Sequence, residues 1–82
     1  MKTINYTTTG TCSRRIDIEI NDDNTVRSVI FHGGCNGNTQ GISMLVKGMP
    51  VDEVIARLEG ITCGNKSTSC PDQLATALRG TL

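Results

Sequence analysis

The sequence has few of the residues from which a large hydrophobic core is built. Its 82 residues include no Trp, one Tyr and one Phe. A chain of this length buries only about 60% of the surface that its unfolded form exposes. Small domains with thin cores usually gain stability from a disulfide, a bound metal or a partner subunit. The four cysteines of the chain are the candidates for such a stabilising element.

Charged runs and long apolar stretches are also lacking. Eight basic and eight acidic residues give a formal net charge of +0, and no run of like charge exceeds two residues. Without a basic stripe or aromatic side chains for base stacking, the sequence does not favour nucleic-acid binding. The polar N-terminal stretch MKTINYTTTG resembles neither a signal peptide nor a membrane span. We therefore expect a cytoplasmic protein that does not insert into a membrane.

This location bears on the cysteines, because cytosolic thiols are kept reduced, which argues against two structural disulfides. The spacings between consecutive cysteines are 23, 28 and 7 residues, so no Cys-x-x-Cys pair of a zinc finger or a thioredoxin-like site is present. Four cytosolic thiols then favour a shared metal or cluster site, with redox-active thiols and two disulfides as alternatives. The expected ligands are Cys12, Cys35, Cys63 and Cys70.

The hydrophobic pattern predicts strands first and helices afterwards. Residues 13–20 alternate strictly between apolar and polar, a turn NDDN follows, and residues 25–32 form the next strand. The Thr-rich stretch at residues 3–12 suits another strand. After GGCNGN, three helices are expected, the first ended by Gly48, the second from Pro50 to Gly60 and the third from Pro71. Their apolar faces comprise Ile42, Leu45, Val46 and Met49; Val51, Val54, Ile55 and Leu58; and Leu74, Ala75, Ala77 and Leu78.

This order predicts an α+β fold in a single domain over residues 1–82: a small antiparallel sheet of about three strands, followed by three helices packed on one face. All four cysteines then fall at the ends of elements. Cys12 connects the first two strands, Cys35 follows the third strand, Cys63 follows the second helix, and Cys70 starts the last one. Since binding groups are commonly carried at such positions, a ligand role is favoured over a core role.

Cys70 lies directly before Pro71, which suits the first position of a helix and makes Cys70 the expected N-cap. The N-terminus of a helix carries a partial positive charge, which favours the thiolate form that binds metal. Asp72 is expected to complement the helix dipole.

Glycines surround Cys35 in the stretch GGCNGN. Gly33, Gly34 and Gly37 allow a sharp turn and a close approach to a bound group, and their N–H groups can donate to sulfur. A plain turn is the simpler interpretation of these glycines. His32 is a further possible ligand, although a solvated side chain is the simpler interpretation there too.

The stretches TSCPDQLATAL and GGCNGNTQGIS resemble a family of small bacterial proteins with four cysteines, known by the TSCPD motif. The resemblance covers essentially the whole chain. That family is similar to a C-terminal domain of adenosylcobalamin-dependent ribonucleotide reductases, which implies such a reductase as a partner. Because 82 residues cannot form the barrel that holds nucleotide and cobalamin, we do not expect reductase activity from this chain itself.

The order of elements is also similar to that of U-type iron–sulfur scaffold proteins. Those proteins carry three ligand cysteines at the places where this chain has Cys12, Cys35 and Cys70. The resemblance implies a cluster scaffold or carrier, with a cysteine desulfurase or a cluster acceptor as partner.

This chain departs from the scaffold pattern at two positions, with Arg14 in place of an Asp and Ser69 in place of a His. In the scaffold proteins that Asp is associated with release of the cluster. Cys63 is expected to replace the histidine as the fourth ligand, which implies an all-thiolate site that holds its metal more firmly. Four thiolates suit tetrahedral zinc and equally suit an iron–sulfur cluster. The alternatives are a thiol-redox or accessory protein of ribonucleotide reduction and an interaction domain stabilised by structural zinc.

Overall fold

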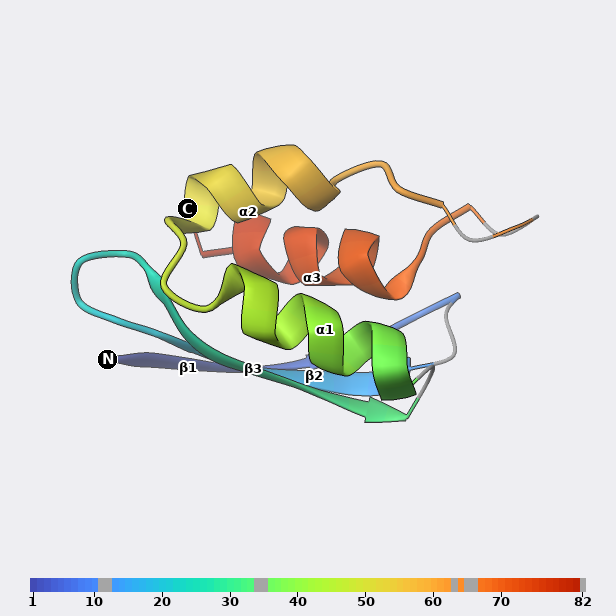
Figure 1. The fold of residues 1–82 in the computed structure, drawn as a ribbon, viewed down its shortest axis with the longest axis horizontal. Coiled ribbons are helices and arrows are strands. Elements are labelled where there is room, and N and C mark those ends of the chain that lie inside the picture. Colours follow the sequence, from blue (N-terminus) through green and yellow to red (C-terminus); the bar gives the residue numbers. More distant parts are fainter. Residues whose placement is uncertain (11–12, 34–35, 63, 65–66, 82) are drawn as a thin grey trace.

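The computed structural model describes residues 1–10, 13–33, 36–62, 64 and 67–81. Its elements are the strands β1 (Lys2–Thr7), β2 (Ser13–Ile20) and β3 (Val26–Gly33) and the helices α1 (Asn36–Val46), α2 (Val51–Leu58) and α3 (Cys70–Arg79). The strands form one layer and the helices cover one face of it (Figure 1). The predicted α+β fold is therefore confirmed.

The sheet has the order β1-β2-β3, and both neighbouring pairs are antiparallel. The alternation in β2 decides which face is covered. Ile16, Ile18 and Ile20 are at most 2% exposed. The residues between them point to the opposite face, which remains open to solvent. The period-two pattern of residues 13–20 thus predicted both the strand and its buried side correctly.

Because of the turn between β2 and β3, strand β3 starts one residue later than predicted. Asn24 adopts a left-handed φ of 66°, a conformation that Asn tolerates better than most residues. The Asn21 N–H donates to the Thr25 carbonyl over 2.8 Å. Thr25 forms an isolated bridge with Pro50, and β3 starts at Val26.

Helix α1 begins at Asn36, several residues before the apolar pattern starts at Ile42. Thr39 is buried with 4% exposure and shares the inward face with Ile42 and Val46. The assignment of Leu45 to the buried face is wrong, since its side chain is 77% exposed. Consecutive residues lie about 100° apart around a helix, so placing Val46 against the sheet turns Leu45 away from it.

Helix α2 starts one residue later than predicted, because Pro50 precedes the helix with a ψ of 141°. Its carbonyl accepts the N–H of Val54 over 3.1 Å and so closes the first turn. Val51, Val54 and Ile55 are buried as predicted. Gly60, with a left-handed φ of 89°, lies just beyond the end of the helix.

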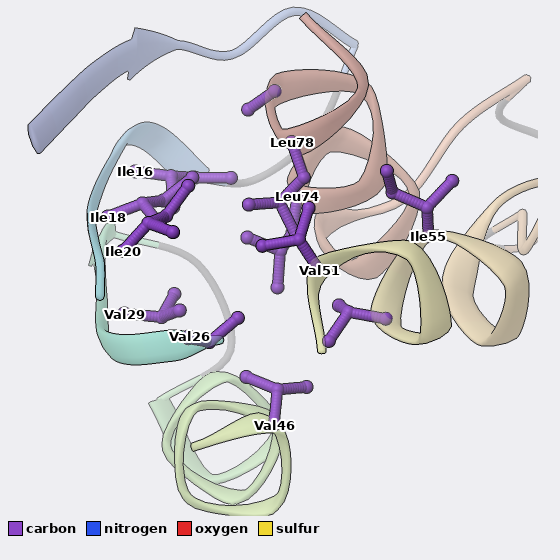
Figure 2. Packing of buried hydrophobic residues seen from close by; sticks show 12 residues of the cluster. Ile16, Ile18, Ile20, Val26, Val29, Val46, Val51, Ile55, Leu74 and Leu78 are labelled. Atoms are coloured by element: carbon purple, nitrogen blue, oxygen red, sulfur yellow. The ribbon is translucent and has the colours of Figure 1, made fainter. Parts of the chain in front are cut away.

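The core lies between the sheet and α2 and α3, and α1 closes one side (Figure 2). Leu74 and Leu78 of α3 and Val51 of α2 point toward the isoleucines of β2, and Val46 of α1 adds to the same cluster. The inward residues predicted for α3 are therefore confirmed. Over the ranges that the structure describes, no helix is long and apolar enough to cross a membrane.

Candidate functional site

Cys70 is the first residue of α3 and is half-buried. The other three predicted ligands, Cys12, Cys35 and Cys63, lie outside the described residues, as does Gly34. Among the residues that are described, no three His, Cys, Asp or Glu side chains form a group that could hold a metal ion. The four-thiolate site therefore stays a prediction, and for the other three cysteines the structure describes only residues that lie near them in the sequence.

Described segments that adjoin three of the cysteines in the sequence, Cys12, Cys35 and Cys70, lie at one end of the fold. Ser13, which directly follows Cys12, pairs with Gly33, which lies two residues before Cys35. Helix α1 begins at Asn36, the residue after Cys35. The start of β2, the end of β3 and the starts of α1 and α3 all lie toward the same end of the long axis (Figure 1).

Two of the three predicted glycines can be placed. Gly33 ends β3 with a φ of 86°, a left-handed conformation in which a side chain would be strained. Gly37 lies in the first turn of α1, and a Cβ added there would meet no atom within 4 Å. The backbone therefore requires a glycine at position 33, while contact of either residue with a bound group stays a prediction.

Ser69, rather than Cys70, is the N-cap of α3, which corrects the sequence prediction. Ser69 has extended backbone angles, and its Oγ accepts the N–H of Asp72 over 3.1 Å. Cys70 and Pro71 are the first two helical residues. Serine is a preferred N-cap, and an acidic residue three positions later is close to a capping-box pattern. The sequence contains this capping pattern, but the placement of Pro71 at the first helical position led to Cys70 being predicted as the N-cap.

The side chain of Asp72 joins the two ends of the connection between α2 and α3. Its Oδ1 accepts the N–H of Gly60 over 2.7 Å, and its Oδ2 accepts the hydroxyl of Thr68. Ser69 Oγ also donates to the carbonyl of Ile61 over 2.6 Å. Asp72 lies in the first helical turn, as its predicted dipole role requires, and in addition it fastens the loop to the helix start.

Gln73 links the start of α3 to the segment after β1 through hydrogen bonds that the sequence did not predict. Its side chain is only 6% exposed. Its Oε1 accepts the N–H of Thr9 over 3.1 Å, and its Nε2 donates to Thr68 Oγ1 over 3.0 Å. A Cβ added at Gly10, which has a φ of 70°, would lie 3.1 Å from Thr68 Cγ2. Thr9 and Gly10, in the described part of the connection between β1 and β2, therefore lie close to Thr68 and Gln73 at the start of α3.

We expect Ser69→Ala to lower the free energy of unfolding by about 1–2 kcal/mol, because it removes the cap and leaves the Ile61 carbonyl without its hydroxyl donor. Urea unfolding of the metal-free protein measures the effect. Ser67→Ala, at an exposed position before the helix, is the matched control and should change stability by less than about 0.5 kcal/mol. Equal losses in both variants would contradict the capping role.

His32 belongs to a polar cluster on the open face of the sheet. Its Nε2 lies 2.7 Å from Asp17 Oδ2, and Arg15 Nε lies 3.1 Å from Asp17 Oδ1. The hydrogen bond from His32 is the main cause that lowers the pKa of Asp17, followed by the hydrogen bond and charge of Arg15, while desolvation opposes them. This cluster accounts for the position of His32 without a metal.

The lowered pKa of Asp17 predicts a pH dependence. Above the ordinary pKa of 3.8, the ionised carboxylate contributes its full stabilisation, which is lost as the pH falls through the lower folded-state pKa. We therefore expect the stability of Asp17→Asn to fall less steeply than that of the wild type below pH 3.8. Urea unfolding between about pH 6 and pH 2 measures this slope. Parallel curves for the two proteins would show that the pair contributes nothing.

Of the comparisons with known proteins, the one with protein families gives a match. No curated protein and no solved structure matches this chain. A family model described as the TSCPD domain matches residues 1–82. The motif itself, residues 68–72, is the segment that forms the cap and the loop fastening described above. The chain therefore belongs to the TSCPD domain family.

Proposed function

We propose that the chain is a module that binds a metal or an iron–sulfur cluster. Its ligands are the thiolates of Cys12, Cys35, Cys63 and Cys70. The observation that supports this most is the mutual attachment of the described segments beside Cys12, Cys35 and Cys70. Ser13 pairs with Gly33, and Thr9 donates to Gln73 near the start of α3. Segments that are far apart in the sequence are thus held at one end of the domain.

The donor chemistry fits the proposed group. Four thiolates can bind zinc tetrahedrally or hold an iron–sulfur cluster. Cys70 lies in the first turn of α3, where the positive end of the helix dipole favours an anionic ligand. Bound zinc would stabilise the fold, whereas a cluster would be a cargo to be held or passed on.

The partners follow from the resemblances and are part of the proposal. A cluster carrier would exchange with a cysteine desulfurase or a cluster acceptor, and the TSCPD family relationship suggests a ribonucleotide reductase. A cytoplasmic location, which the sequence predicts, would keep the thiols reduced and available for binding.

Anaerobic purification followed by metal and sulfide analysis and an absorption spectrum tests the proposal. We expect bound zinc, or iron with sulfide, and a lower melting temperature after chelation under reducing conditions, because metal binding contributes to folding in small metallodomains. The proposal is wrong if the reduced chain holds neither group and its melting curve is unchanged by added Zn²⁺ or by Fe²⁺ with sulfide. A reversible disulfide in such a chain would instead support the thiol-redox alternative.

A further inference from the structure

We propose that Gln73 is a positioning residue of the metal site, an inference that rests on the proposed function. Through its side-chain amide, Gln73 holds the connection that leads into Cys12 against the helix start that carries Cys70. The residue itself does not contact the metal.

One continuous chain of hydrogen bonds carries this inference. The Thr9 N–H donates to Gln73 Oε1 over 3.1 Å, and Gln73 Nε2 donates to Thr68 Oγ1 over 3.0 Å. The Thr68 hydroxyl donates in turn to Asp72 Oδ2, and Asp72 Oδ1 accepts the Gly60 N–H over 2.7 Å. Three separate segments are therefore linked: the β1–β2 connection, the start of α3 and the residues that follow α2.

The two central members of this chain are buried, with 6% exposure for Gln73 and 9% for Thr68. Buried polar groups that are hydrogen-bonded on both sides resist displacement, since breaking one bond leaves another polar group unsatisfied. Thr68 also packs its methyl group close to Gly10, two residues before Cys12 in the sequence. The network therefore restrains Thr9 and Gly10, which precede Cys12 in the sequence, relative to the helix start at Cys70.

Such restraint matters for metal binding because a ligand that is already held in place loses less conformational entropy on binding. Removal of residues that orient the ligands of a metal typically weakens its binding by about 10- to 100-fold. We assign an effect of this size to Gln73 and to the Thr68 hydroxyl on which its amide rests.

The experiment compares the wild-type chain with Gln73→Met, Thr68→Val and Thr68→Ser under reducing conditions. Gln73→Met keeps the side-chain length and removes both hydrogen bonds, and Thr68→Val removes the hydroxyl that Thr68→Ser retains. Gln40→Met, on the exposed face of α1, is the matched control. Co²⁺ is the probe: its affinity is measured by chelator competition and its thiolate ligation by absorption. Amide hydrogen exchange at Thr9 is measured in the metal-free proteins.

We expect Gln73→Met and Thr68→Val to weaken Co²⁺ binding by about 10- to 100-fold and to alter its thiolate absorption. Exchange of the Thr9 amide should accelerate relative to that of Ile18 in the core, which separates a local release from general destabilisation. Thr68→Ser should restore most of the affinity, and Gln40→Met should bind as the wild type does.

Wild-type affinity in Gln73→Met would overturn the positioning role, and so would an equal loss in Gln40→Met. Equal losses in Thr68→Val and Thr68→Ser would also overturn it, because only Thr68→Val removes the hydroxyl, and the loss would then not depend on the hydrogen bond from Gln73. If the wild-type chain binds no Co²⁺ at all, the proposed function fails first, and the role assigned to Gln73 fails with it.

Discussion

Cys70→Ser is expected to weaken metal or cluster binding by more than about 100-fold. This loss exceeds the ~10- to 100-fold effect that is typical when a residue that orients a ligand is removed. Cys70 starts a helix that is capped by Ser69 and fastened through Asp72. A ligand on such an ordered element loses little entropy when it binds, so its removal takes away a pre-positioned thiolate. Metal content after anaerobic purification, together with chelator competition, measures the loss.

The other cysteines should differ in a defined order. Cys35 lies in the sequence between the end of β3 and the start of α1, so Cys35→Ser should be as damaging as Cys70→Ser. Cys63 lies in the connection between α2 and α3, and Cys63→Ser should retain part of the binding and make the metal more exchangeable. If Cys63→Ser proves as damaging as Cys70→Ser, the site is a rigid four-thiolate cage, and the likeness to exchangeable scaffolds fails. Full metal content in Cys70→Ser would contradict the proposed site.

Leu74→Ala is expected to lower the free energy of unfolding by about 2–5 kcal/mol. Leu74 has 0% exposure and points from α3 toward the isoleucines of β2 (Figure 2). The substitution removes buried apolar surface and leaves a cavity. A domain of this size has a total stability on the order of 4–12 kcal/mol, so the loss is a large fraction of it. Urea unfolding of the metal-free protein measures the effect.

Leu45→Ala is the matched control for this prediction. It makes the same chemical change on α1, at a side chain that is 77% exposed. Its effect should stay within about 0.5 kcal/mol, as for most surface substitutions. Similar losses in the two variants would mean that α3 does not pack on the sheet as described, or that Leu45 is covered in solution.

The sequence by itself determined the fold class and most of the core. Strict alternation in residues 13–20 specified which side chains of β2 are buried, because successive residues of a strand point to opposite faces. The apolar residues of α2 and α3 predicted the buried faces of those helices for a similar reason, since three- and four-residue spacings return to one side of a helix. The four cysteines and the TSCPD motif were likewise sufficient to name the candidate ligands and the family.

The tertiary structure alone decided how α1 faces the sheet and what holds the start of α3 in place. Leu45 and Val46 are equally apolar, and only the packing of α1 against β3 leaves the first exposed and buries the second. Gln73 is polar, so the hydrophobic pattern gave no reason to expect it to be buried. Its side chain is accommodated in the interior by a hydrogen bond from the Thr9 N–H, which lies 64 residues away in the sequence. Periodicity records only local spacing along the chain, whereas these contacts depend on where distant segments meet.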